Sequence, residues 1–289
     1  MKKINNQIIN KAINYIYENV SESLSVDKVA DYCGYSKYYL NRQFKDETGD
    51  SLYAFIKKTK LEQSALKLKI ESTKTITDIG EEYGYSSSNY ATVFKQRFDI
   101  SPQKFRENCM DFLNGSDFMH TDSLIDFTTL QNNIRIEDVL PRFIIYERKK
   151  GNYHNLVNDW CDFTKKYEKY IDKNSRFIEC TIGDPSITNP DECLYDIGFT
   201  IDKDSPLIKN QITLKNNQET LNTMIIPAGK YAIYRYKGYP ADIYRTYQSI
   251  LCNWFEKTGH EIDNRPAYDL YNEIHSDCFL DMDIYFPIK

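Results

Sequence analysis

The chain has 289 residues, of which 41% are hydrophobic and 27% are charged. This length suits two hydrophobic cores, and this composition excludes an intrinsically disordered chain. No apolar run approaches the roughly 18 residues that cross a bilayer, and residues 1–7 are too polar for a signal peptide. We therefore expect a cytoplasmic protein that does not contact a membrane.

Cysteine and histidine spacing argues against two common kinds of site. The 7 cysteines form no C-x-x-C pair, and the 4 histidines have no partner at metal-ligand spacing. A disulfide framework and a zinc site both need regular spacing. We expect free thiols, no metal and no cofactor. The absence of a phosphate-binding glycine loop argues against nucleotide chemistry as well.

The net charge of −5 is unevenly distributed along the chain. Residues 1–110 carry 17 Lys/Arg against 14 Asp/Glu, whereas residues 111–289 carry 20 against 28. Such asymmetry favours a nucleic-acid-binding module joined to a domain of another kind.

The strongest pattern is an internal repeat with a period of 50 residues. The segment CGYSKYYLNRQFK at residues 33–45 recurs without a gap as YGYSSSNYATVFK at residues 83–95. Each copy is predicted to form a helix that ends at Gly34 or Gly84, then a tight turn and a second helix. Serine or threonine residues are expected to cap these helices: Ser25, Ser36, Thr75 and Ser86 or Ser87. A long amphipathic helix is predicted between the copies.

A helix-turn-helix presents the outer face of its second helix to the DNA major groove. In the first copy this face carries polar and basic side chains: Lys37, Tyr38, Asn41, Arg42 and Lys45. Arginine can pair with guanine and asparagine with adenine, so this face is predicted to read bases. In the second copy the face is poorer in charge: Ser87, Ser88, Thr92, Lys95 and Gln96. Hydroxyl contacts to phosphates or bases are expected there.

Residues 24–106 resemble the DNA-binding domain of the AraC/XylS transcription regulators. The matching signature is S-x-x-x-L-x-R-x-F at residues 36–44, G-Y-S at 84–86, and F-K-x-x-F-x-x-S-P-x-x-F-R at 94–106. The resemblance implies an all-α domain of seven helices, with the two motifs about one DNA turn apart. Gly80 stands where the family prefers alanine. The second motif is also one residue shorter than usual, which leaves the register of its recognition helix open by one position.

From residue 134 the pattern changes to short strands. Strands are predicted at residues 142–148, 176–182, 194–201, 223–236, 267–274 and 279–287. Two amphipathic helices are predicted, one from Leu156 to Tyr167 and one from Ile243 to Trp254. Trp160 and Trp254 lie in their apolar stripes and are expected mainly in the core. The order strand, helix, strands occurs twice, which predicts a duplicated α+β domain with an antiparallel sheet and helices on one face.

Alternation along the last two strands predicts the composition of the open sheet face. If the aliphatic residues face the helices, the open face collects aromatic and acidic side chains: Asp269, Tyr271, Glu273, Phe279, Asp281, Asp283 and Tyr285. Aromatic rings together with carboxylates suit an organic cation. An ordinary solvated sheet face is the alternative.

Residues 135–289 resemble the GyrI-like effector-binding domain. The matching pieces are G-x-Y at residues 151–153, I-P-A-G-K-Y at 226–231 and R-P-x-x-x-x-Y at 265–271. The resemblance implies a small-molecule groove at the pseudo-twofold axis of the duplicated halves. Family members that bind cationic drugs have a glutamate at the position of Asp269. The predicted effector site comprises Tyr153, Asp269, Tyr271, Glu273, Asp281 and Tyr285.

These patterns predict a bacterial transcription regulator that responds to a small molecule. An AraC-type domain is expected at residues 1–110, a linker or short helix at 111–133 and a GyrI-like domain at 134–289. The expected partners are a double-stranded DNA operator, a small-molecule effector and RNA polymerase. The resemblance to AraC-type regulators with such a second domain also implies a monomer, since one chain already holds two motifs. Two alternatives remain: a second domain that binds a protein partner, or a hydrolase with Asp269 or Glu273 as base.

Overall fold

The computed structural model describes residues 2–107, 124–153, 156–205, 213–214, 219–274 and 279–289. The chain divides into two compact units. One unit, here called the sheet unit, comprises Met1–Asn10, Ile134–Gly238 and Arg265–Lys289. The other, the helical unit, comprises Lys11–Asn133 and Tyr239–Asn264. Each unit therefore combines segments from both halves of the sequence.

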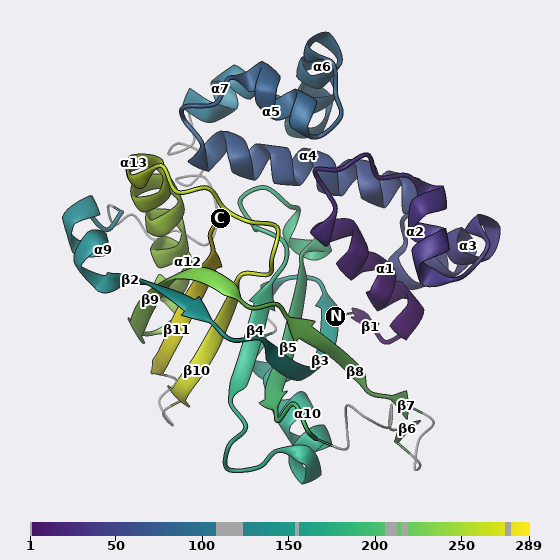
Figure 1. The fold of residues 1–289 in the computed structure, drawn as a ribbon, viewed down its shortest axis with the longest axis vertical. Helices are drawn as coiled ribbons and strands as arrows, with labels where there is room; N and C mark the ends of the chain where they lie inside the picture. The colour runs from purple at the N-terminus through teal and green to yellow at the C-terminus, as the bar shows by residue number, and fades with distance from the viewer. Residues whose placement is uncertain (1, 108–123, 154–155, 206–212, 215–218, 275–278) are drawn as a thin grey trace. The chain divides into compact units, whose positions relative to one another are not determined.

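Seven helices form within residues 2–107, the number that the AraC/XylS resemblance implies (Figure 1). They are α1 (Gln7–Glu18), α2 (Val26–Cys33), α3 (Lys37–Thr48), α4 (Leu52–Ile70), α5 (Ile76–Glu82), α6 (Ser87–Phe98) and α7 (Pro102–Glu107). The long helix α4 joins the two motifs and contacts α3, α5 and α7. No helix within the described residues is long and apolar enough to cross a membrane.

Later segments complete the helical unit. They are α9 (Phe127–Asn133), α12 (Pro240–Ser249), the π-helical segment η4 (Ile250–Phe255) and α13 (Glu256–Thr258). The segment η4 contacts α4 and α9. Trp254 is buried, and its indole N–H donates to Gln131 Oε1 at 3.0 Å. Trp254 is thus a core residue, as its apolar stripe predicts.

The sheet unit contains one large antiparallel sheet. Its strands are β1 (Lys2–Ile4), β2 (Ile134–Val139), β3 (Arg142–Lys150), β4 (Phe177–Thr181), β5 (Leu194–Ile201), β8 (Asn222–Ile226), β9 (Gly229–Gly238), β10 (Tyr268–Ile274) and β11 (Leu280–Pro287). The order is β1-β3-β5-β4-β10-β11-β9-β2, and β8 also pairs with β3. The remaining elements are α10 (Leu156–Tyr167), the 3-10 turns η2 (Glu168–Tyr170) and η3 (Pro190–Glu192), and the short pair β6 (Thr213–Leu214) and β7 (Glu219–Thr220).

The prediction of one strand at residues 223–236 is wrong, because two strands form there. β8 ends at Ile226 and β9 begins at Gly229, since Pro227 has no N–H to continue a ladder. β8 pairs with β3, whereas β9 pairs with β11 and β2. The other five predicted strands form within two residues of their expected bounds. β1 and β2 were not expected.

The duplication predicted from the sequence is confirmed by the strand order. The first half runs β3, α10, β4, β5, and the second runs β9, α12, β10, β11. In each half the first strand pairs with the last, and the last pairs with the middle strand. The two halves therefore meet where β4 pairs with β10.

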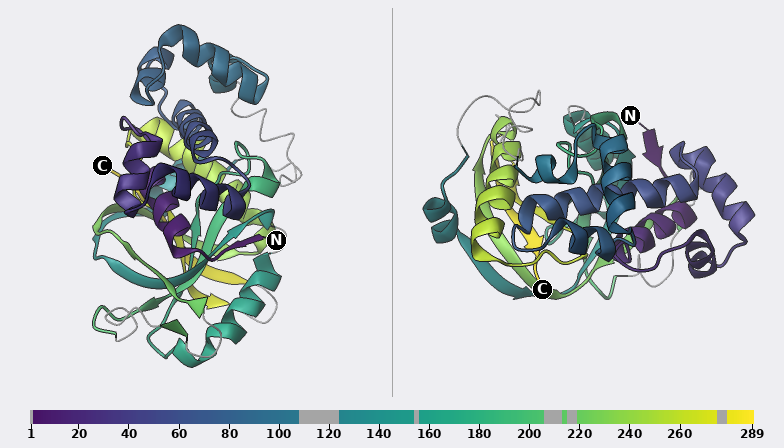
Figure 2. Two further views of the ribbon diagram at one scale, coloured as in Figure 1. Left: turned by 90° about the vertical axis from the view of Figure 1, so that its right-hand side faces the viewer. Right: turned by 90° about the horizontal axis from the view of Figure 1, so that it is seen from above.

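The two faces of this sheet bury different clusters. On one face, here called the α10 face, Phe163 and Tyr167 of α10 pack against Ile145, Ile197 and Phe199. The opposite face gathers residues from strands at both sides of the sheet: Ile144, Tyr146, Ile226, Tyr231, Tyr268 and Tyr285. Residues from these distant strands can share one cluster only because the sheet is strongly curled (Figure 2). We call this the concave face.

Candidate nucleic-acid interface and effector site

The first helix-turn-helix forms as its local sequence predicts. Ser25 Oγ accepts a hydrogen bond from the N–H of Lys28, and Gly34 ends α2 with a left-handed φ of 81°. Ser36 Oγ then accepts from the N–H of Tyr39 and caps α3. Leu40 and Phe44 are fully buried. With its apolar face held in this way, α3 presents its opposite face to solvent.

Four of the five residues predicted on α3 to contact DNA are exposed: Lys37, Tyr38, Arg42 and Lys45. Tyr38 is 81% exposed, which is unusual for so large a ring in a folded domain. Lys37 forms a 3.3 Å ion pair with the exposed Asp27, an interaction that solvent weakens. A basic and aromatic surface of this kind suits a phosphate backbone and the base edges beside it.

Asn41 is placed differently from the prediction. Its side chain is half-buried, and Asn41 Oδ1 accepts a 2.9 Å hydrogen bond from the N–H of Leu52. Leu52 is the first residue of α4, where backbone N–H groups lack helical partners. The side chain therefore joins the recognition helix to α4, and its acceptor oxygen is not available to a base.

The second motif is also capped by its own side chains. Thr75 and Asp78 form a reciprocal capping box at α5, and Gly84 has a left-handed φ of 82°. Ser86, the N-cap residue of α6, makes no side-chain cap bond, so the cap expected there from the sequence is not formed. All five predicted contact residues on α6 are exposed: Ser87, Ser88, Thr92, Lys95 and Gln96. Arg97 lies outside this set and pairs with Glu62 at 2.7 Å.

Gly80, the departure from the family pattern, is explained by Tyr90. A Cβ on Gly80 would lie 2.8 Å from Tyr90 Cγ and Cδ1. Tyr90 is buried, and its hydroxyl donates to Ser64 Oγ at 2.9 Å, so the ring is fixed between α5 and α4. The glycine thus makes room for a large residue in the core of the second motif.

In the sheet unit, a carboxylate and two aromatic side chains meet on the α10 face. Glu179 of β4 is buried. Its Oε2 accepts hydrogen bonds from the Tyr271 hydroxyl at 3.1 Å and from the Trp160 indole N–H at 3.4 Å. The rings of Trp160 and Tyr271 meet edge to face at 5.7 Å. Asp269, also buried, lies directly opposite Glu179 in the β4–β10 pair. We call Trp160, Glu179, Asp269 and Tyr271 the seam cluster.

The electrostatics of the seam cluster are set by burial. Removal from water raises the pKa of Glu179 from 4.5 to about 7, although the bonds from Tyr271 and Trp160 oppose this rise. Among the described residues Glu179 has no ion-pair partner. Near neutral pH the carboxyl is therefore close to half ionised, and a cation beside it would favour the ionised form.

Tyr153 lies on the same face but uses its hydroxyl elsewhere. The hydroxyl donates to the backbone oxygen of Gly183 at 3.1 Å, and that of Leu194 lies 3.4 Å away. Its ring packs 4.9 Å from that of Tyr195. Tyr153 therefore contributes a ring surface near the seam cluster and no free hydroxyl.

The expectation that Asp269, Tyr271, Asp281 and Tyr285 share one face is wrong. In the β10–β11 register Asp269 pairs with Ile284, and Tyr268 pairs with Tyr285. Asp269 and Tyr271 consequently point to the α10 face, whereas Asp281 and Tyr285 point to the concave face. A bulge between Tyr271 and Glu273 then brings Glu273 opposite Asp281.

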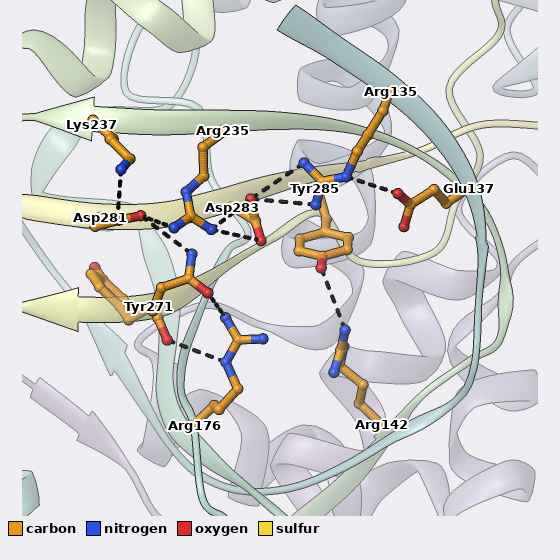
Figure 3. A network of polar contacts seen from close by, with 11 residues as sticks. Arg135, Glu137, Arg142, Arg176, Arg235, Lys237, Tyr271, Asp281, Asp283 and Tyr285 are labelled. Carbon is orange, nitrogen blue, oxygen red and sulfur yellow. Dashed lines mark hydrogen bonds and ion pairs between the residues drawn. The ribbon is translucent and has the colours of Figure 1, made fainter.

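The carboxylates of the concave face already have cationic partners. Asp281 pairs with Arg235 at 2.6 Å and with Lys237 at 3.2 Å. Asp283 lies 3.5 Å from Arg235 and 3.4 Å from Arg135. This arrangement does not leave Asp281 open to an organic cation (Figure 3).

Glu179 is not among the site residues predicted from the sequence, and Trp160 is predicted to be mainly a core residue. The internal duplication is the sequence feature that could have identified Glu179. Because β4 of the first half corresponds to β10 of the second, an acidic residue at Asp269 directs attention to its counterpart Glu179. Extending the repeat to the middle strands would have found the pair.

Comparison with known proteins agrees with both parts of this description. A GyrI-like small molecule binding domain matches residues 132–289, more than half of the chain, and a helix-turn-helix domain matches residues 6–108. The multiple antibiotic resistance protein MarA of Escherichia coli is 40% identical over 113 residues, which cover 39% of this chain and 87% of MarA. The probable transcription factor PqrA of Proteus vulgaris is 39% identical over 89 residues, covering 30% of this chain and 72% of PqrA.

The xylose operon regulatory protein of Escherichia coli is 36% identical over 98 residues, which cover 34% of this chain and 25% of that protein. The helix-turn-helix domain match spans the residues that hold both motifs. The chain is therefore an AraC-type DNA-binding transcription regulator whose C-terminal half belongs to the GyrI-like family of small-molecule-binding domains.

Proposed function

We propose that this regulator responds to an organic cation that binds beside the seam cluster on the α10 face. The observation that carries the proposal is the environment of Glu179. It is a buried carboxyl with two aromatic hydrogen-bond donors and no ion-pair partner among the described residues. An uncompensated buried carboxylate is costly, and a bound cation would offset that cost.

The neighbours of Glu179 favour a cation that is also apolar. The rings of Trp160 and Tyr271 attract positive charge through their faces and remove water from the surroundings. Asp269 supplies a second carboxyl on the same face, one methylene shorter than the glutamate of cation-binding family members. The preferred effector is therefore an aromatic or alkyl ammonium compound.

Titration calorimetry on the full chain tests this assignment. Benzyltrimethylammonium is the probe, and benzyl alcohol is the neutral control of similar shape. The cation should bind saturably, and Glu179→Gln should weaken it by roughly tenfold or more. Glu168→Gln, which removes an exposed carboxyl from the same unit, is the matched control. Equal affinity of wild type and Glu179→Gln for benzyltrimethylammonium would show that the seam cluster does not bind the cation.

On the DNA side, we propose that Lys37, Tyr38, Arg42 and Lys45 of α3 and the exposed set of α6 contact the operator. The second motif would contribute mainly phosphate contacts, because Lys95 is the one cation of its predicted set.

The boundaries at residues 110 and 134 remain our proposal for the two functional domains. We also propose that the protein acts in the cytoplasm as a monomer and contacts RNA polymerase.

We infer that the chain is not an enzyme. The two residues considered as catalytic bases, Asp269 and Glu273, lie on opposite faces of the sheet and do not converge on one reacting group. Unchanged benzyltrimethylammonium after prolonged incubation, followed by mass spectrometry, is the expected result. The appearance of a product would contradict this inference.

A further inference from the structure

The concave face ends in a group of basic side chains that the seam cluster does not use (Figure 3). Arg142 is the first residue of β3, and Arg176 directly precedes β4. The residues two positions further along each strand, Ile144 and Ile178, belong to the concave-face cluster. Strand alternation therefore places both arginines on the concave face.

The carboxylates nearby are occupied by other cations. Asp281 and Asp283 are held by Arg235, with Lys237 and Arg135 as further partners. No salt bridge joins either carboxylate to Arg142 or Arg176 within the part of the chain that the structure describes. The two arginines therefore take no part in the ion pairs of Asp281 and Asp283.

Among the described residues, the side chains of Arg142 and Arg176 donate to neutral oxygens only. Arg142 Nε donates to the Tyr268 hydroxyl at 3.1 Å, and Arg142 Nη2 lies 3.5 Å from the Tyr285 hydroxyl. Arg176 donates from Nε to the backbone oxygen of Tyr271 at 3.4 Å and from Nη2 to Asn272 Oδ1. A guanidinium group carries five N–H donors, so both arginines retain donors for a further partner.

The charge balance here is opposite to that of the surrounding half of the chain. The network holds five cationic side chains, Arg135, Arg142, Arg176, Arg235 and Lys237, against three carboxylates, Glu137, Asp281 and Asp283. Glu273 lies opposite Asp281 in the β10–β11 register, and including its carboxylate still leaves an excess of positive charge. Residues 111–289 as a whole carry 20 basic against 28 acidic residues.

Partial burial makes this excess unfavourable without an anion. Removal from water lowers the pKa of Arg176 most, and the positive charges of Arg142 and Arg235 also lower it, although Tyr285 and Asp283 oppose this shift. An oxyanion between Arg142 and Arg176 would reverse this repulsion. Guanidinium groups also suit carboxylate and phosphate because their donors lie in a planar fork.

We propose that Arg142 and Arg176 form a second ligand site, on the concave face, for the carboxylate or phosphate group of a small organic anion. Arg142 is held in place by the stacked rings of Tyr268 and Tyr285, which lie 4.4 Å apart. Arg176 reaches the same face from the start of β4, which is separated from β3 by β5 in the sheet. The site lies on the opposite face from the seam cluster and does not depend on the function proposed for it.

Titration calorimetry on the full chain at constant ionic strength tests this site. Inorganic phosphate and citrate are the probes, with chloride as the balancing anion, so that the two titrations separate phosphate from carboxylate recognition. One of them should bind saturably, and Arg176→Gln should weaken it roughly tenfold. Lys165→Gln removes a positive charge from the exposed side of α10 in the same unit and should leave the affinity unchanged.

Two further variants distinguish recognition from damage to the fold. Arg176→Lys keeps the charge but loses the planar fork, so its affinity should fall between those of wild type and Arg176→Gln. A cooperative thermal unfolding transition in Arg176→Gln would show that the variant remains folded, whether or not a cation binds the seam cluster. No saturable binding of either anion, or equal anion affinity in wild type and Arg176→Gln, would overturn the proposal.

Discussion

Glu179 and Asp269 are direct cross-strand neighbours on β4 and β10, the two strands at which the duplicated halves of the sheet meet. Both side chains are buried and point to the α10 face. Like charges directly opposite each other in a sheet destabilise it, and burial adds to the cost. The pair is therefore best accommodated when one carboxyl is protonated or when a cation lies beside it.

The raised pKa of Glu179 predicts a pH-dependent stability. Burial raises this pKa to about 7 from 4.5, so folding favours the protonated form. The resulting contribution to the free energy of unfolding is fully present when the pH is below 4.5, the pKa of this carboxyl in the unfolded chain. It is lost as the pH rises through about 7, the pKa in the folded chain. The loss is on the order of 3 kcal/mol.

Urea denaturation of wild type and Glu179→Gln between about pH 5 and pH 8 measures this loss. Wild type should lose stability relative to the variant over this range, whereas Glu168→Gln should follow wild type. A difference between wild type and Glu179→Gln that stays constant with pH would show that the carboxyl does not titrate here.

Asn41→Ala should affect folding more than base recognition. The substitution removes the acceptor for the Leu52 N–H at the start of α4, which should cost about 1 kcal/mol in the free energy of unfolding. Thermal melting and operator binding by fluorescence anisotropy separate the two effects. An unchanged melting temperature with altered preference at one base pair would instead support a base-reading role.

Arg42→Ala should relax specificity at one base pair of the operator. Arg42 is exposed on α3, and loss of a bidentate contact to guanine costs roughly 1–3 kcal/mol of specific binding. Affinities for an operator selected from random duplexes and for its single-base variants provide the measurement. Lys57→Ala, which removes an exposed charge from α4, is the control. Equal losses on every duplex would assign Arg42 to phosphate contact only.

Gly80→Ala should destabilise the second motif although alanine is the better helix former. The gain in helix propensity is about 1 kcal/mol, but the added Cβ would lie 2.8 Å from the Tyr90 ring. Overpacking of this kind costs typically 1–3 kcal/mol, so a net loss is expected. In the Tyr90→Leu background the same substitution should become neutral or stabilising. A stabilised single variant would mean that the ring moves aside.

The features predicted correctly from sequence are local ones. Ser25, Ser36 and Thr75 accept the expected cap bonds, and Gly34 and Gly84 have the expected left-handed backbone. Each of these depends on a few consecutive residues and on the helix that follows. The same is true of the five strands that form close to their predicted bounds.

The sheet faces that were predicted wrongly depend on pairing between distant segments. The faces of β10 were assigned from its own alternation, but the register with β11 pairs Tyr268 with Tyr285 and moves Asp269 to the other face. A shift of one residue changes the face of every side chain on a strand. The partners of Asp281 and Asp283 come from β9 and β2, and alternation within one strand cannot identify them.

We expect a small molecule bound by the GyrI-like half to change DNA binding by the AraC-type half. Fluorescence anisotropy of the full chain on its selected operator, with and without saturating benzyltrimethylammonium, tests this most directly. We predict a 5- to 150-fold change in affinity, corresponding to a coupling free energy of about 1–3 kcal/mol, and no change in Glu179→Gln. Identical operator affinities for the free and cation-saturated wild type would show that this cation does not regulate DNA binding.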